Sequence, residues 1–158
     1  MRRVLFGVIQ LLLFAAYANA QSTAMIVEEF GLLGKWAIEC SRPPSPRNEH
    51  ALFALTSAGV WVFNDFGPDY DGMVYRVVDA ERDAPDKLLL RQVLATDDTV
   101  VLVIVMLKSN DKIRVWSSRT ADGNVLVKDG TIASASDQAT RWAGRCDRRA
   151  GPPNSGVQ

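Results

Sequence analysis

Apolar and polar residues alternate along most of the chain after Gly34, and short clusters of Gly, Pro, Asn, Asp and Ser interrupt the alternation. Successive side chains of a β-strand point to opposite faces of its sheet, so this pattern is typical of strands with one buried face. We predict strands over residues 35–40, 51–55, 60–66, 73–80, 87–95, 99–108, 112–119, 124–128 and 140–146.

The connections between these segments favour an antiparallel arrangement. Asp122-Gly123 is a strong hairpin signal, and the three prolines of residues 41–50 place that segment in an irregular loop. The fold class is therefore all-β: an antiparallel meander that forms a small barrel or a sandwich of eight or nine strands. An up-and-down barrel closes antiparallel only with an even number of strands. Nine strands thus imply an open barrel or one misassigned segment.

Residues 22–31 predict one short helix in front of the strands. Ser22 can cap its start and Gly31 can end it. Its apolar stripe at helical spacing consists of Met25, Ile26, Phe30 and Leu33. We expect this helix to cover one end or one side of the core. The segment Val100–Leu107 is apolar on both faces, so one face meets the core and the other needs cover, from this helix or from a partner.

The first twenty residues have the three parts of a secretory signal peptide in order. Arg2 and Arg3 form the positive start, residues 4–17 are apolar, and Ala18-Asn19-Ala20 is an A-x-A cleavage site. We predict export by the general secretory route, cleavage after Ala20, and a periplasmic or secreted protein. No later apolar stretch reaches the length of a membrane span.

Composition indicates a folded chain with no electrostatic preference for nucleic acid. The 158 residues are 47% hydrophobic and 23% charged, and 18 Lys and Arg balance 18 Asp and Glu. Removing residues 1–20 removes Arg2 and Arg3, which leaves 16 basic and 18 acidic groups. This balance argues against a nucleic-acid partner. We predict a monomer with a single β domain over residues 21–147 and a disordered tail over residues 148–158.

Both cysteines, Cys40 and Cys146, lie in the exported part of the chain. An even number of cysteines in an oxidising compartment predicts a disulfide, although two free thiols or an intermolecular bridge remain alternatives. The bond would close the first strand on the last. By alternation it would put Trp36 and Trp142 on the same side of the sheet, inside the barrel.

The start of the first strand resembles a known signature. Leu33-Gly34-Lys35-Trp36 follows the helix and is similar to the G-x-W motif of lipocalins and related calycin barrels. Those are small exported barrels that bind apolar ligands inside, and some bacterial periplasmic protease inhibitors have the same start. The resemblance implies that Trp36 seals the closed end and that Arg145 or Arg141 packs across it. Simple alternation would require a bulge at Gly144 to turn Arg145 inward.

A broader resemblance is to small exported proteins of alphaproteobacteria with no assigned activity. It covers most of residues 33–147 and implies a cell-envelope location and a disulfide. The similar features are Trp36…Cys40-Ser41, the Pro-rich loop up to Asn48, the turn Lys128-Asp129-Gly130 and the terminal Arg145-Cys146.

Catalytic, metal and cofactor chemistry have little support in the residues. The single histidine, His50, is expected to be a surface residue that hydrogen-bonds its loop, because a site with Ser41 and Glu49 would require convergence on one loop. Asp65, Asp69 and Asp71 do not match the EF-hand spacing and are expected to form a solvated connection. We therefore predict no catalytic, metal or cofactor site.

Aromatic residues remain as candidates for ligand contacts. The candidate ligand-binding residues are Trp36, Phe53, Phe63, Tyr75 and Trp142. They either line a cavity or fill the core of the barrel. The sequence thus predicts a non-enzymatic, exported binding module for a small apolar ligand. The alternative is a protein-interaction or protease-inhibitor-like module of the cell envelope.

Overall fold

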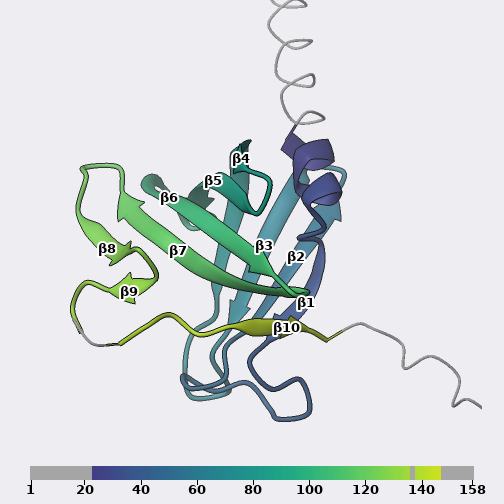
Figure 1. Ribbon diagram of the computed structural model, residues 1–158, viewed down its shortest axis with the longest axis vertical. Helices are drawn as coiled ribbons and strands as arrows, with labels where there is room; N and C mark the ends of the chain where they lie inside the picture. Colours follow the sequence, from purple (N-terminus) through teal and green to yellow (C-terminus); the bar gives the residue numbers. More distant parts are fainter. Residues whose placement is uncertain (1–22, 136–137, 147–158) are drawn as a thin grey trace, which may run out of the picture.

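The computed structural model describes residues 23–135 and 138–146 as a closed antiparallel barrel of eight strands with two further strands at one side (Figure 1). Around the ring the order is β10-β1-β2-β3-β4-β5-β6-β7, and β10 also pairs with β7. The strands are β1 (Gly34–Ala37), β2 (His50–Thr56), β3 (Gly59–Asp65), β4 (Met73–Ala84), β5 (Lys87–Leu94), β6 (Asp97–Ser109), β7 (Lys112–Thr120), β8 (Val125–Lys128), β9 (Thr131–Ile132) and β10 (Ala143–Arg145). The predicted signal segment 1–20, the capping residue Ser22 and the tail 148–158 lie outside the described residues.

The sequence predicted nine strands, an odd number, and β8 is the one of these nine that lies outside the ring. The predicted strand exists, but it is not part of the ring. One edge of β7 is shared: β10 pairs with Lys112 and Ile113 at its start, whereas β8 pairs with Ser118 and Arg119 near its end. The hairpin of β8 and β9 therefore lies outside an eight-stranded ring, beyond β7 (Figure 1). The predicted turn forms between β7 and β8, where Gly123 adopts a φ of 89°.

The N-terminal helix covers residues 23–30 and ends at a glycine. Gly31 has a φ of 76°; its N–H donates to the Glu28 carbonyl, and the Leu32 N–H donates to the Val27 carbonyl. This is the Schellman pattern of helix ends. The prediction that Met25 belongs to the buried stripe was wrong, because its side chain is 58% exposed.

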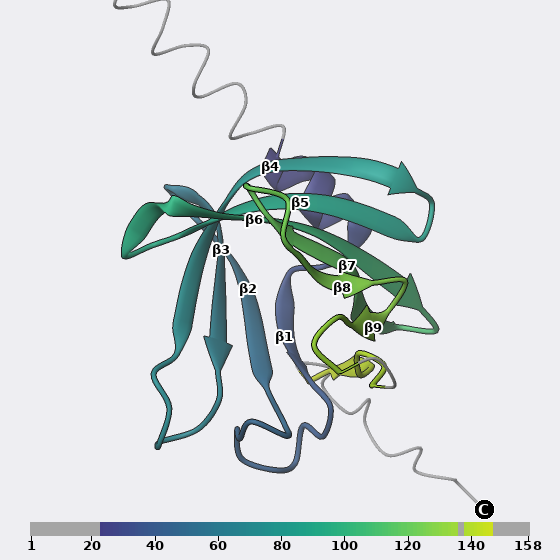
Figure 2. The same ribbon diagram turned by 90° about the vertical axis from the view of Figure 1, so that its left-hand side faces the viewer.

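The buried face of the helix contains Thr23, Val27 and Phe30 instead. These residues are four and three positions apart and so share one face, whereas Met25 points elsewhere. The helix lies across one end of the barrel, as Figures 1 and 2 both show, and not over the outer face of β6. On that face Val101, Val103 and Val105 are half-buried in the sheet, and each lies opposite a residue of β5.

The barrel interior is apolar and continuous with the helix. Its buried side chains come from the helix and from nearly every strand of the ring, which makes one core for the described chain. The buried core cluster is Val27, Phe30, Leu32, Trp36, Phe53, Val60, Val62, Tyr75, Val77, Ala80, Leu88, Leu90, Met106 and Ile113.

Three donors close the helix end of the barrel by binding backbone carbonyls. Trp36 Nε1 donates to the Leu32 carbonyl at 2.7 Å, and the Arg145 guanidinium donates to the Leu33 carbonyl at 2.5 Å. Lys108 Nζ donates to the carbonyl of Phe30, the last helical residue, at 2.8 Å. Each contact satisfies a carbonyl at or just beyond the helix C-terminus, where cations are also favoured by the helix dipole.

The residues of the last strand do not face the sides that were predicted from the disulfide and strand alternation. Trp36 lies directly opposite Arg145 in the register, so these two residues share a face without any bulge at Gly144. The Arg145 guanidinium carbon is 5.6 Å from the centre of the Trp36 ring. The expectation that Trp142 lies inside with Trp36 was wrong. The prediction assumed that Cys40 is part of the first strand and shares a face with Trp36. Because β1 ends at Ala37, Cys40 is not in the strand and its side-chain direction does not follow from Trp36.

The disulfide between Cys40 and Cys146 forms as predicted and spans 106 positions. We expect its removal to destabilise the fold by up to about 4–5 kcal/mol, because it restricts the unfolded chain over a long loop. Urea denaturation of the oxidised protein and of the variant Cys40→Ser/Cys146→Ser measures the difference. Reductant should lower the stability of the wild type and leave the double variant unchanged. Equal stability of the two oxidised proteins would contradict this expectation.

Candidate functional site

A half-open cavity of about 320 Å³ is lined by side chains of the barrel interior and by residues of the segment 132–143. Known small-molecule sites begin at roughly this size, about 300 Å³. At about 30 Å³ per molecule, the space corresponds to roughly ten waters. The cavity is therefore large enough for one small ligand, and the barrel is not completely filled by its own side chains.

The two rims of the barrel differ in their connections. At the helix rim, β2–β3, β4–β5 and β6–β7 are joined by turns of two residues. The opposite rim has the long connections 38–49 and 66–72, which Figures 1 and 2 show at the end away from the helix. These two loops touch: a Cβ on Gly67 would lie 2.6 Å from the Pro44 carbonyl oxygen. Pro46 and Glu49 of the first loop line the cavity, together with residues of the segment 132–143.

The wall of the cavity is mainly apolar. Its aromatic and aliphatic side chains come from β1, β2, β3, β6 and β7, strands that are distant in sequence and adjacent in the ring. These residues are Trp36, Ala51, Phe53, Val62, Ile104, Met106, Ile113 and Val115, and Ile38, Pro46, Ile132, Ala139 and Ala143 add to them from the connections and from β9 and β10. Such a surface favours an apolar ligand, because contact removes apolar area on both sides from water.

Polar and charged side chains interrupt this wall: Glu49, Asn64, Gln92, Arg114, Gln138, Thr140 and Arg141. Three of them, Glu49, Asn64 and Gln92, belong to the first part of the ring. Glu49 precedes β2, Asn64 is near the end of β3 and Gln92 is near the end of β5. All three positions are therefore toward the rim opposite the helix. Gln92 is only 3% exposed, and within the described residues its amide makes no hydrogen bond to the protein.

Burial raises the pKa of the Glu49 carboxyl above its ordinary value. The pKa of the Tyr75 hydroxyl is also raised, first by burial and then by the negative charge of Glu49. The Tyr75 hydroxyl donates to Met73 Sδ at 3.1 Å. Among the charged side chains with described positions, none forms an ion pair with Glu49. The cavity lining thus contains one carboxyl group and the guanidinium groups of Arg114 and Arg141, and Arg114 Nε is a buried atom without a hydrogen-bond partner in the described residues.

The five predicted ligand residues are divided between two faces of the barrel. Trp36 and Phe53 line the cavity, and Tyr75 is buried in the adjoining core. Neither Phe63, which is 39% exposed, nor Trp142 is among the residues that line the cavity, although Trp142 stacks on Arg114, which does line it. Whether Trp36, Phe53 and Tyr75 contact a ligand stays a prediction.

Sequence reasoning missed the polar members of the wall. The signal that could have found them is alternation: Glu49 is two positions before Ala51, and Asn64 and Gln92 are two positions after Val62 and Leu90. Each therefore shares the inward face of its strand. Polar residues near strand ends are common on surfaces, so alternation alone would not have separated these three from solvated residues.

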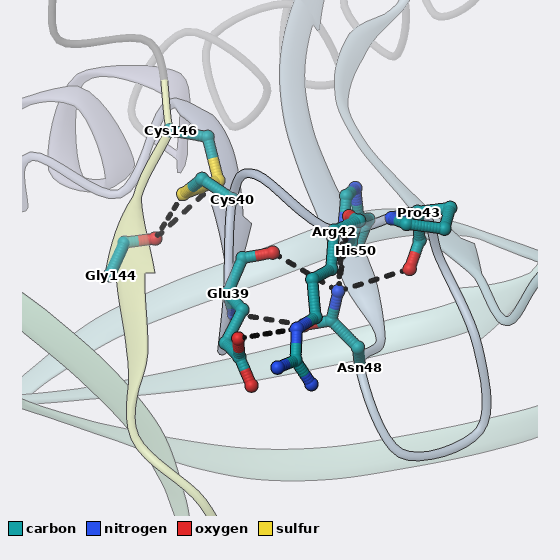
Figure 3. The surroundings of a disulfide bond; sticks show 8 residues. All are labelled: Glu39, Cys40, Arg42, Pro43, Asn48, His50, Gly144 and Cys146. Atoms are coloured by element: carbon teal, nitrogen blue, oxygen red, sulfur yellow. Dashed lines mark hydrogen bonds and ion pairs between the residues drawn. A yellow bond between two sulfur atoms is a disulfide. The ribbon is translucent and has the colours of Figure 1, made fainter.

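Asn48 organises the loop beside the cavity, as Figure 3 shows. Its side-chain oxygen accepts from the Glu39 N–H at 2.9 Å. Its amide nitrogen lies within 3.2 Å of the carbonyls of Glu39, Arg42 and Pro43 and 3.1 Å from His50 Nε2. One buried side chain thus joins both ends of loop 38–49, and the disulfide anchors the same loop to β10 (Figure 3).

His50 was expected at the surface, and this was wrong. Its side chain is 5% exposed, because loop 38–49 covers the start of β2. Its one hydrogen bond within the described chain is to Asn48, so it forms no Ser-His-acid arrangement with Ser41 or Glu49. Asp65 accepts from the Gly67 N–H, as a turn residue does. In residues 23–135 and 138–146, no three His, Cys, Asp or Glu side chains are grouped to hold a metal ion.

Cations and aromatic rings are stacked beside the pairing of β7 with β10. The Arg114 guanidinium lies 5.2 Å from the centre of the Trp116 ring and 4.7 Å from that of Trp142. Lys87 Nζ also lies 5.0 Å from the centre of the Trp116 ring. A Cβ on Gly130 would lie 3.1 Å from the Arg114 guanidinium. These contacts join β5, β7 and the segment before β10, so they stabilise the place where β10 pairs with β7.

Comparison of the chain with protein-family models, with curated proteins and with solved structures finds no match in any of the three. The part of the chain that the structure describes has no helix long and apolar enough to cross a membrane.

We expect Asn48→Ala to lower the free energy of unfolding by about 1–3 kcal/mol, because it leaves three part-buried carbonyls and the Glu39 N–H without their side-chain partner. Chemical denaturation measures this loss. The control is Asn124→Ala, since Asn124 is exposed and its hydrogen bonds are made by its backbone. Equal stability of the two variants would show that the loop does not depend on the Asn48 amide.

Glu49→Gln should stabilise the protein more at neutral than at acidic pH. The pKa of Glu49 is higher in the folded state than in the unfolded state. At a pH between these two pKa values, the folded protein therefore keeps a proton on Glu49 that the unfolded protein has released. The unfolding free energy of the wild type therefore falls as pH rises through this window, and Gln removes the penalty. Denaturation at both pH values tests this. The control Glu81→Gln, on an exposed part of β4, should change stability by less than about 0.5 kcal/mol.

Proposed function

We propose that this chain is an exported, non-enzymatic binding module that holds one small, mainly apolar ligand inside its barrel. The observation that carries the proposal is the cavity of about 320 Å³ with its apolar wall. A barrel of about eight strands is the size that either fills with side chains or holds one small ligand. The unfilled interior favours the second case.

The proposed location is the periplasm or the exterior. The disulfide between Cys40 and Cys146 supports an oxidising compartment. The order of residues in segment 1–20, with cleavage expected after Ala20, supports secretion. We propose that the mature chain is monomeric and that its resemblance to small exported proteins of alphaproteobacteria reflects a shared cell-envelope location.

The contact between Arg145 and Trp36 supports the proposed likeness to lipocalins and calycin barrels. The Trp of Gly34-Lys35-Trp36 is buried below the helix, and an arginine from the last strand lies across its ring. Arg141, the other candidate for this position, is exposed and donates to the Arg47 carbonyl. The likeness agrees with a closed end at the helix and a ligand entrance at the opposite rim.

A second candidate function is a protein-interaction or protease-inhibitor-like module of the cell envelope. It is favoured by two apolar residues on the outside of the barrel: Leu52 and Phe63 lie opposite each other on β2 and β3 and are 41% and 39% exposed. Crosslinking in cells would then give a discrete partner, and Phe63→Ser should weaken that product.

Native mass spectrometry of the mature protein from its own host tests the binding function. Cleavage and the disulfide together predict the mass of residues 21–158 less two hydrogens. A bound ligand adds a further discrete mass. Protein that is uniformly free of any added mass would count against the binding function and would favour the interaction module.

Filling the cavity should reduce the bound mass. Ala51 lines the cavity, whereas the neighbouring Ala54 on β2 does not. We expect Ala51→Phe to lower the occupied fraction at least about tenfold, because a phenyl ring takes up space that the ligand needs. Ala54→Phe is the matched control and should keep the bound mass. Thermal denaturation identifies any loss that comes from unfolding.

A further inference from the structure

We propose that the ligand of the cavity is an apolar molecule with an anionic head group, and that Arg114 binds this head group beside the edge of β7. The inference rests on the binding function proposed above and names the ligand class. The observation that carries it is a guanidinium group on the cavity lining that has no hydrogen-bond acceptor in the described chain.

The N–H donors of the Arg114 guanidinium have no partner among the described residues. Its Nε is a buried atom without a hydrogen bond. Its Nη groups also make none within the described chain, but they are not buried, so a molecule in the cavity can reach them. Buried polar groups in proteins nearly always have a hydrogen-bond partner, and a guanidinium can only donate. The ligand can provide the acceptor that the described chain does not.

The position of this guanidinium is fixed by its neighbours. Its central carbon lies 5.2 Å from the centre of the Trp116 ring and 4.7 Å from that of Trp142. A Cβ on Gly130 would lie 3.1 Å from the guanidinium, so the glycine backbone packs against this group. Ring contacts use the charge of a cation and not its N–H donors. They therefore hold the group in place and leave its donors available to an anion.

Arg114 lies where the cavity reaches the edge of β7. Ile113 belongs to the core, and Arg114, the next residue of the strand, has its side chain on the opposite face. Both residues line the cavity, as does Thr140. The Thr140 hydroxyl donates to the Val115 carbonyl at 2.6 Å, and its N–H donates to the Gly130 carbonyl at 2.7 Å. A ligand with its tail on the apolar wall can thus place its head group at this edge.

The charges around this edge favour an anion. Arg141 adds a second cation to the lining, and its guanidinium donates to the Arg47 carbonyl at 2.6 Å. Among the described residues, neither Arg114 nor Arg141 forms an ion pair. Lys87 Nζ lies near the same Trp116 ring on which Arg114 stacks. The planar guanidinium matches the paired oxygens of a carboxylate or a phosphate, so these are the head groups expected.

Among the described residues of the lining, Glu49 is the only acid, and its charge acts elsewhere. Burial raises the pKa of its carboxyl, and no nearby cation lowers that pKa. The negative charge of Glu49 raises the pKa of the Tyr75 hydroxyl, on the far side of the core from β7 in the ring order. Glu49 therefore does not compensate the charge of Arg114.

The experiment compares octanoate, octyl phosphate, octanol and octylamine, which share one tail and differ in the head group. Isothermal titration of the oxidised mature chain is done at neutral pH, where a carboxylate is ionised and an alkylamine is protonated. We expect at least one of the two anions to bind about tenfold or more tightly than octanol, as a charged hydrogen bond allows. Octylamine should bind no more tightly than octanol. The tighter anion identifies the head group.

Two substitutions of Arg114 separate its charge from its shape. Arg114→Gln removes the charge and should weaken the anion about tenfold or more, while octanol stays within about threefold of the wild type. Arg114→Lys keeps the charge without the planar group and should recover part of the loss. Arg119→Gln, on the exposed part of the same strand and outside the lining, should leave all affinities unchanged. Circular dichroism and denaturation show whether each variant is folded.

The outcomes that overturn the inference differ from those that overturn the binding function. Octanol or octylamine binding as tightly as both anions would reject the anionic head group and keep the binding function. Equal losses for the anion and octanol in Arg114→Gln would show that Arg114 only supports the cavity. A host ligand without an acidic group would also reject the inference. If the wild type binds none of the four and carries no added mass from its host, the binding function fails as well.

Discussion

The pairing of β10 with both β1 and β7 is the constraint on which the rest of the structure depends. It turns an open sheet with two exposed edges into a ring, and open edges are sites of unwanted pairing. A strand of three residues has few ladder hydrogen bonds of its own. Contacts beside it therefore hold the closure: the disulfide at Cys146, the guanidinium of Arg145 at the Leu33 carbonyl, and the hydroxyl of Thr140 at the Val115 carbonyl.

Closure of the ring also produces the difference between its two ends. At one end the helix, Trp36 and Arg145 close the barrel with buried side chains and satisfied carbonyls. At the other end, Asn48 and the disulfide hold loop 38–49 beside the cavity. Glu49, Asn64 and Gln92 of the cavity wall lie toward this second end.

Much of the local structure could be predicted from residue patterns. The β-rich fold, the short helix ended by Gly31, the Asp122-Gly123 turn and the disulfide all follow from signals within a few residues or from the cysteine count. The errors have a common cause. Met25, His50 and Trp142 were placed by local alternation or loop character, but burial of each depends on segments far away in the chain.

The sequence by itself determined the strand segments other than β9, where the helix ends and that two cysteines can join the ends of the domain. Those features depend on side-chain periodicity, turn chemistry and residue type, which are local. Only the tertiary structure decided that β8 leaves the ring, that Arg145 covers Trp36 and that Glu49, Asn64 and Gln92 share one cavity. Alternation tells which side chains of a strand point the same way. It does not tell which way is inside, because the inside exists only once β10 has closed the ring.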